Sequence, residues 1–141
     1  MTRFLSFVAA CSLSSAALAQ PASPAASALD GQWRGTSDGG SCNAPLDYVL
    51  TIESGIVDGS AFDTTVKGPQ PNLKKAPPPP PGPGLWQVYG VAKGNTFSLT
   101  ALASVQGSVR RSSKLAAVAQ GNTLTVSESG GCGRTARLRR G

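Results

Sequence analysis

Apolar and polar residues alternate with a period of two along most of the chain beyond its first thirty residues. In 46–53, four large apolar residues occupy every second position from Leu46 to Ile52, and polar residues such as Asp47 and Thr51 fall between them. Strict alternation over eight residues indicates a β-strand with one buried face and one solvated face. The pattern alone therefore predicts a β protein.

Eight segments of this kind follow one another, separated by turn residues. The predicted strands are 31–36, 46–53, 56–66, 85–92, 97–104, 113–119, 123–128 and 134–140. Short connections between sequential strands are typical of an up-and-down arrangement, and pairing the first strand with the last removes both exposed edges. We expect an all-β fold, a small eight-stranded antiparallel up-and-down barrel, with an open sheet or a β-sandwich as the alternative.

Two similar segments support this hairpin pattern. Residues 91–99 (VAKGNTFSL) match residues 118–126 (VAQGNTLTV) at a shift of 27, and each predicts a strand, a Gly-Asn turn and a second strand.

The alternation is weaker at Gly59, a candidate bulge, and in 105–113, which we expect to be a loop or bulged edge. Many inward positions are alanine, which predicts a small, closely packed interior.

A proline-rich segment, 67–84, interrupts the strands and contains eight of the eleven prolines. Proline fixes φ and lacks the N–H that a ladder requires, so this segment cannot be a central strand. We expect 77–81 to form a stiff polyproline II spacer that stands out from the domain. It is either an insertion tolerated in a hairpin loop or a ligand for a proline-recognising partner.

The first 19 residues have the pattern of a secretory signal peptide. Arg3 supplies the positive charge, an apolar stretch follows, and 17–19 (ALA) is a small-x-small cleavage site. We expect a flexible Pro/Ala/Ser leader over 20–28 and a single β domain over 29–141. The protein is thus expected to be periplasmic or secreted. An acylated lipoprotein cysteine at Cys11 is the alternative, and no other apolar run approaches the length of a membrane span.

Export leaves two cysteines, Cys42 and Cys132, and an even pair in an oxidising compartment predicts a disulfide between them. The chain has 13 basic and 7 acidic residues, a net charge of +6, which falls to about +5 once Arg3 is removed. A basic surface favours an anionic ligand or envelope component, although solubility alone would also account for the charge. Export argues against nucleic acid as the partner.

Catalytic chemistry is poorly represented. The chain has no histidine, which excludes Ser-His-Asp and Cys-His nucleophiles. The two cysteines that export leaves cannot supply the four ligands of a zinc site. Ser113 and Lys114 are adjacent on a predicted strand and so face opposite sides of it. Glu128 is the carboxylate in phase with a core face, and we expect it to pair with an arginine of the last strand. We therefore expect no enzyme activity, metal or cofactor.

The arginines of the last strand are the candidate ligand-binding residues. Arg134 and Arg140 are in phase with the apolar face at its two ends, so they are predicted at the barrel mouths, where a guanidinium can bind a carboxylate or phosphate. Arg137 and Arg139 face outward and would form a basic stripe with Arg34 if the first strand is the neighbour. Alternatively, the mouth arginines cap the core by bonding free carbonyl groups.

The opening 31–35 (GQWRG) and the ending 132–139 (CGRTARLR), with Gly-rich hairpins between them, resemble a loose group of small exported bacterial proteins of unknown function. The G-x-W opening is more distantly similar to calycin barrels, which include lipocalins, avidins and small metalloprotease inhibitors. These resemblances imply export and a barrel, and they imply no activity or ligand site. The functions we expect are a non-catalytic binding or envelope-associated protein, an inhibitor of a secreted hydrolase presenting the proline-rich loop, or a structural envelope protein.

Overall fold

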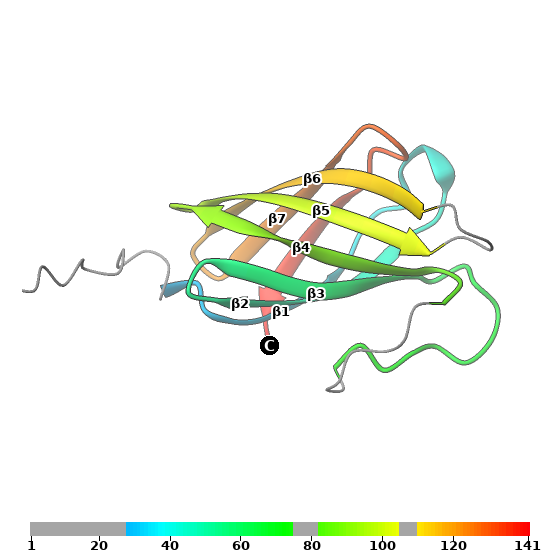
Figure 1. The fold of residues 1–141 in the computed structure, drawn as a ribbon, viewed down its shortest axis with the longest axis horizontal. Helices are drawn as coiled ribbons and strands as arrows, with labels where there is room; N and C mark the ends of the chain where they lie inside the picture. Colours follow the sequence, from blue (N-terminus) through cyan, green and yellow to red (C-terminus); the bar gives the residue numbers. More distant parts are fainter. Residues whose placement is uncertain (1–27, 75–81, 105–109) are drawn as a thin grey trace, which may run out of the picture.

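The structure is a computed structural model that describes residues 28–74, 82–104 and 110–141. Its eight strands pair antiparallel with their neighbours in sequence, and the first also pairs with the last, so the barrel is closed (Figure 1). The elements are β1 (Gly31–Thr36), a 3₁₀ turn η1 (Gly40–Cys42), β2 (Leu46–Glu53), β3 (Ile56–Asp63), β4 (Leu85–Lys93), β5 (Thr96–Ser104), β6 (Arg110–Gln120), β7 (Thr123–Ser129) and β8 (Thr135–Arg140). The predicted up-and-down barrel is confirmed, and the open sheet and the β-sandwich are not formed.

The predicted bounds of two strands were wrong by three residues. β3 ends at Asp63 because its carboxylate accepts hydrogen bonds from the backbone N–H and the hydroxyl of Thr65, at 2.9 and 2.6 Å, and so closes a turn. β6 begins at Arg110, so the predicted loop or bulged edge over 105–113 included four residues, 110–113, of a regular ladder with β5. Pairing with a neighbouring strand satisfies the backbone there whatever the side-chain pattern. The other six strands agree with prediction to within one residue.

Gly59 does not form the predicted bulge. It lies in continuous register between Leu50 of β2 and Val88 of β4. A Cβ atom at this position would lie 2.3 Å from the carbonyl oxygen of Val49. The glycine therefore allows a close approach of two strands, which is the other common use of glycine within a sheet.

Side chains that alternate inward from the strands fill the barrel. They form one cluster, which includes Trp33, Leu50 and Leu138, each 0% exposed. Alanines contribute part of the inward face of β5 and β6, among them Ala101 and Ala117. The small, closely packed interior that the sequence predicts is thus observed, and the candidate sites lie at the barrel ends and on its outer wall.

The described parts of the proline-rich segment, 67–74 and 82–84, lie beside the barrel near β3 (Figure 1). Pro71 and Leu73 are half-buried, and both line a groove with outward residues of β1, β2 and β3. This part of the segment therefore packs along the wall. The predicted polyproline II spacer, 77–81, lies outside the described residues.

Two outward-facing apolar residues show what this packing covers. Phe62 and Leu85 are directly opposite each other on β3 and β4, yet they are only 5% and 4% exposed. A Cβ atom on Gly84 would lie 2.6 Å from the Val66 side chain and 3.4 Å from Phe62. Val66 and Gly84, at the two ends of the proline-rich segment, thus help to bury an apolar patch on the outside of the barrel.

The predicted signal peptide, 1–19, and nearly all of the predicted leader lie outside the described residues. The described chain begins with Ala28, and Leu29 already packs against the interior cluster. Among the residues that the structure describes, no helix has both the length and the apolar character needed to cross a membrane.

Candidate functional site

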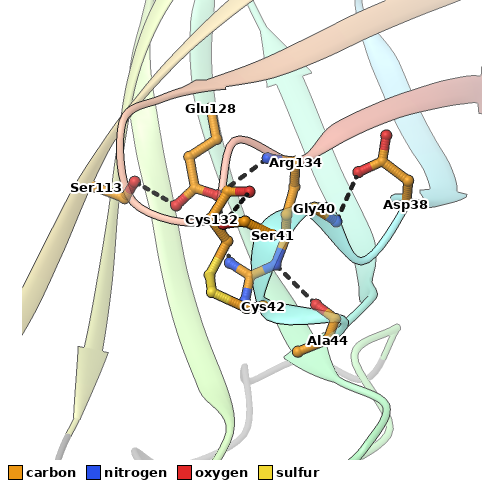
Figure 2. Close-up of a disulfide and its surroundings, with 9 residues drawn as sticks. All are labelled: Asp38, Gly40, Ser41, Cys42, Ala44, Ser113, Glu128, Cys132 and Arg134. Carbon is orange, nitrogen blue, oxygen red and sulfur yellow. Dashed lines mark hydrogen bonds and ion pairs between the residues drawn. A yellow bond between two sulfur atoms is a disulfide. The ribbon is translucent and has the colours of Figure 1, made fainter.

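A disulfide between Cys42 and Cys132 closes one end of the barrel, as predicted, with its Cα atoms 5.2 Å apart (Figure 2). It joins η1, in the connection from β1 to β2, to the turn between β7 and β8. Beside it the Ser41 N–H donates to the Cys132 carbonyl at 2.8 Å. Gly40 has a φ of +55°, and a Cβ there would lie 2.1 Å from the Cys132 carbonyl oxygen, so this close contact requires glycine.

Arg134 lies inside this end of the barrel and is 6% exposed. Its Nη1 is 3.3 Å from Glu128 Oε2, and its Nε donates to the Ala44 carbonyl at 2.7 Å (Figure 2). The other carboxylate oxygen of Glu128 accepts a hydrogen bond from the Ser113 hydroxyl at 2.6 Å. The predicted pairing of Glu128 with an arginine of the closing strand is confirmed. Because the guanidinium is buried among internal partners, this geometry gives no support to ligand binding by Arg134.

Tyr48 of β2 is buried near the same charged pair. Burial, and next the negative charge of Glu128, raise the pKa of its hydroxyl to about 12, while Arg134 acts in the opposite direction. Since loss of the proton would place a second negative charge in this buried end, the neutral phenol is the form that the fold favours.

This shift predicts that Tyr48 weakens the fold at alkaline pH. The unfolded chain releases the tyrosine proton near pH 10, whereas the folded protein keeps it until about pH 12. The stabilising contribution is therefore complete below pH 10 and is lost between pH 10 and 12, a change of about 3 kcal/mol. Urea unfolding of wild type and Tyr48→Phe across this range should show a smaller decline in the variant. Tyr89→Phe, at an exposed tyrosine, is the control, and equal declines in wild type and Tyr48→Phe would contradict the assignment.

Arg140 occupies the opposite mouth of the barrel. Its guanidinium carbon lies 5.0 Å from the centroid of the Trp33 ring, and its Nη2 donates to the Ala28 carbonyl at 2.5 Å. The indole N–H of Trp33 donates to the Leu29 carbonyl at 2.9 Å. The guanidinium thus covers the end of the core while it stays exposed to solvent. At both mouths an arginine bonds a backbone carbonyl, which is the capping alternative that the sequence left open.

Three outward-facing arginines gather on the wall formed by β1 and β8. Arg34 lies directly opposite Arg139 in the strand register, and Arg137 is on the same face of β8, two residues along. Arg137 and Arg139 are exposed, and Arg34 is half-buried with its guanidinium bonded to the Gln32 side-chain oxygen. We call Arg34, Arg137 and Arg139 the basic stripe. Its formation was predicted on condition that the first strand lies beside the last, and this pairing is confirmed.

No arginine of the basic stripe forms an ion pair with another described residue. Within 28–74, 82–104 and 110–141, the ion pair of Arg134 with Glu128 is the only one observed. The guanidinium groups of Arg137 and Arg139 are therefore available to an external anion. A guanidinium presents planar paired donors that match carboxylate, phosphate and sulfate oxygens.

Ser113 and Lys114, the pair considered for nucleophilic catalysis, are not brought together. The Ser113 hydroxyl points to Glu128, whereas the ammonium group of Lys114 donates to the Thr100 hydroxyl at 3.1 Å on the outer wall. In the part of the chain that the structure describes, no group of three or more histidine, cysteine, aspartate or glutamate residues is placed to hold a metal ion.

Comparisons of the chain with models of protein families, with curated proteins and with solved structures found no match. The resemblance to small exported bacterial proteins and to calycin barrels, based on 31–35 and 132–139, therefore stays a prediction. The class that the structure itself defines is a closed, disulfide-linked, all-β barrel with a filled interior and a basic stripe on its wall.

Proposed function

We propose that the protein is an exported, non-catalytic barrel that binds an anionic component of the cell envelope through the basic stripe. The observation that carries this proposal is the register of β1 and β8, which places Arg34, Arg137 and Arg139 next to one another on the outer wall. The interior is filled by side chains, so the wall offers the larger accessible surface. A net charge of +6 adds long-range attraction toward anionic partners.

The spacing of the stripe favours a partner with several anionic groups. Residues two apart on one strand face are about 7 Å apart, and directly opposed residues of antiparallel strands are about 5 Å apart. Three guanidinium groups at these intervals suit a run of neighbouring carboxylates, phosphates or sulfates better than one isolated anion. The confirmed disulfide supports the exported part of the proposal, because such bonds persist in oxidising compartments.

Replacing Arg137 and Arg139 by glutamine should weaken binding to a sulfated polysaccharide. Dextran sulfate is a suitable probe because it presents closely spaced anions without base or protein chemistry. Loss of two exposed charge contacts predicts about a fivefold weaker affinity, with a shallower dependence on salt. Fluorescence anisotropy with labelled dextran sulfate measures both quantities.

The matched control is the double variant Lys93→Gln/Lys114→Gln, which removes the same net charge from other strands, β4 and β6. It should retain most of the affinity. If both double variants lose affinity equally, net charge alone accounts for binding and the stripe has no special role.

The inhibitor alternative has less support. An inhibitory loop is most effective when it stands clear of its scaffold, whereas Pro71 and Leu73 are half-buried on the barrel wall. A structural envelope protein remains the alternative if the stripe binds nothing.

A further inference from the structure

A groove runs along the outer wall of β1, β2 and β3, bordered by residues 70–74, which we call the arm. Its larger part has a volume of about 550 Å³ and is lined by residues that include Thr51, Asp58 and Leu73. Its smaller part has a volume of about 340 Å³ and shares Val49, Leu73 and Lys74 with the larger. The two parts therefore form one elongated surface between the strands and the arm.

The shape of the groove fits an extended peptide. It follows β2 from Asp47 in the smaller part to Glu53 in the larger part. Six steps along a strand correspond to about 20 Å, which is the length of an extended segment of about six residues. A compact small molecule would fill only part of it.

Two carboxylates without internal partners lie at one end of this groove. The chain has seven acidic residues, and five of them accept hydrogen bonds from within the fold: Asp30, Asp38, Asp47, Asp63 and Glu128. The remaining two, Glu53 and Asp58, accept none from a described residue, and both line the groove. They are diagonal neighbours on adjacent strands, since Asp58 lies opposite Thr51 and Glu53 follows two residues later. Lys74 of the arm lines the same part of the groove but forms no ion pair with Glu53 or Asp58. Two carboxylates against one ammonium group leave a local negative charge, which favours a cationic ligand.

Ser60 provides an independent observation. It faces outward in the alternation of β3, yet it is only 4% exposed and lines the same groove. Its hydroxyl forms no hydrogen bond with a described residue. No buried side-chain oxygen or nitrogen of the described residues is left without a hydrogen-bond partner, so the Ser60 hydroxyl is not an unsatisfied buried group, and as a groove-lining serine it can both donate and accept. A peptide backbone in the groove can therefore form a hydrogen bond with this hydroxyl.

An exposed apolar patch adjoins the carboxylates. Ile56 and Val91 lie directly opposite each other on β3 and β4, and Tyr89 lies opposite Asp58. These three apolar side chains are 62%, 59% and 47% exposed. Clustered apolar exposure next to unpaired charge is typical of a protein interaction surface.

We propose that this groove binds an extended segment of a partner protein. A lysine or arginine of the segment lies between Glu53 and Asp58, apolar side chains pack against Ile56 and Leu73, and Ser60 bonds the backbone. The closed barrel offers no free edge to which a peptide could add as a strand, so outward side chains and the arm make the contacts. The smaller part of the groove reaches Arg34 of the basic stripe, whereas Glu53 and Asp58 line the larger part, and the inference goes beyond the proposed function.

Nuclear magnetic resonance titration of the ¹⁵N-labelled protein with two end-blocked hexapeptides tests the proposal. One peptide alternates lysine with valine, and the other alternates glutamate with valine. The lysine peptide should shift the amide signals of Thr51, Asp58 and Ser60, and the glutamate peptide should leave them unchanged. Glu53→Gln/Asp58→Asn should weaken binding of the lysine peptide about fivefold.

The control Ser98→Lys/Gln120→Lys makes the same change in net charge at exposed positions on β5 and β6, and it should bind the lysine peptide as wild type does. Equal binding of the two peptides, no binding of either, or insensitivity to Glu53→Gln/Asp58→Asn would overturn the proposal. If light scattering shows a dimer that Glu53→Gln/Asp58→Asn dissociates, the proposal is also overturned, because the groove then binds a second copy of the chain. The Glu53→Gln/Asp58→Asn variant should still bind dextran sulfate. Failure of peptide binding in the groove can therefore be distinguished from failure of anion binding by the basic stripe.

Discussion

Replacing Cys42 and Cys132 by serine is expected to lower the free energy of unfolding by about 4 to 5 kcal/mol. The cysteines are 90 residues apart in sequence, so the bond removes much of the conformational entropy of the unfolded chain. In the fold it joins the connection after β1 to the turn before β8, the two strands whose pairing closes the barrel. For a single domain this is a large fraction of the net stability.

Urea unfolding of wild type and the Cys42→Ser/Cys132→Ser variant measures this effect. The variant should have a lower midpoint and a steeper dependence on urea, because its unfolded chain is more expanded. Adding reductant should shift the wild-type midpoint toward that of the variant and leave the variant unchanged. Two reactive thiols in the folded wild-type protein would show that the bond is not formed.

Replacing Arg134 by alanine is expected to be the most damaging change to a charged side chain, at about 3 to 5 kcal/mol. The substitution removes the ion-pair partner of Glu128, whose side chain is 5% exposed, and leaves the Ala44 carbonyl without its donor. An uncompensated charge in a buried site is far more costly than the loss of a surface pair.

A double-mutant cycle in urea distinguishes this role from a ligand-binding one. Adding Glu128→Gln to Arg134→Ala should recover part of the lost stability, because the uncompensated charge disappears while the amide oxygen still accepts from Ser113. Arg137→Ala, at an exposed arginine, should change stability by less than about 0.5 kcal/mol. If Arg134→Ala is equally harmless, the arginine is not part of the structural network.

The barrel and its disulfide were predictable because each depends on a local or countable signal. Alternation from Leu46 to Ile52 gives one strand and its buried face, and repetition of this signal gives the meander. The two cysteines that follow the predicted signal peptide allow one intramolecular bond. The pairing of Glu128 was predictable for a similar reason, since a carboxylate in phase with a core face requires a partner.

Other features depend on the path of loops, which alternation does not encode. The hydrogen bond from Arg134 to the Ala44 carbonyl depends on the course of the connection around η1. Glycine at position 59 is compatible with a bulge and with a close approach, and only the register decides between them. Prolines in 67–84 exclude a central strand without showing that Pro71 and Leu73 pack along the wall.

The groove was missed for the same reason. Alternation assigns Ser60 to the solvated face, and its burial shows only in the folded structure. Glu53 and Asp58 are ordinary carboxylates for an outer strand face, and their lack of internal partners becomes visible only after the other five acidic residues are assigned. A charge census of the outward positions, strand by strand, is the sequence signal that could have suggested this surface.

The most direct test is to map the surface of the protein that an anionic polymer contacts. The central claim is that recognition takes place on the outer wall and not inside the barrel or at its Arg140 mouth. A titration of the ¹⁵N-labelled protein with short dextran sulfate oligosaccharides should shift the signals of Arg34, Arg137 and Arg139. Shifts confined to Arg140 and to interior residues such as Trp33 would contradict the claim and return the binding site to the barrel mouth.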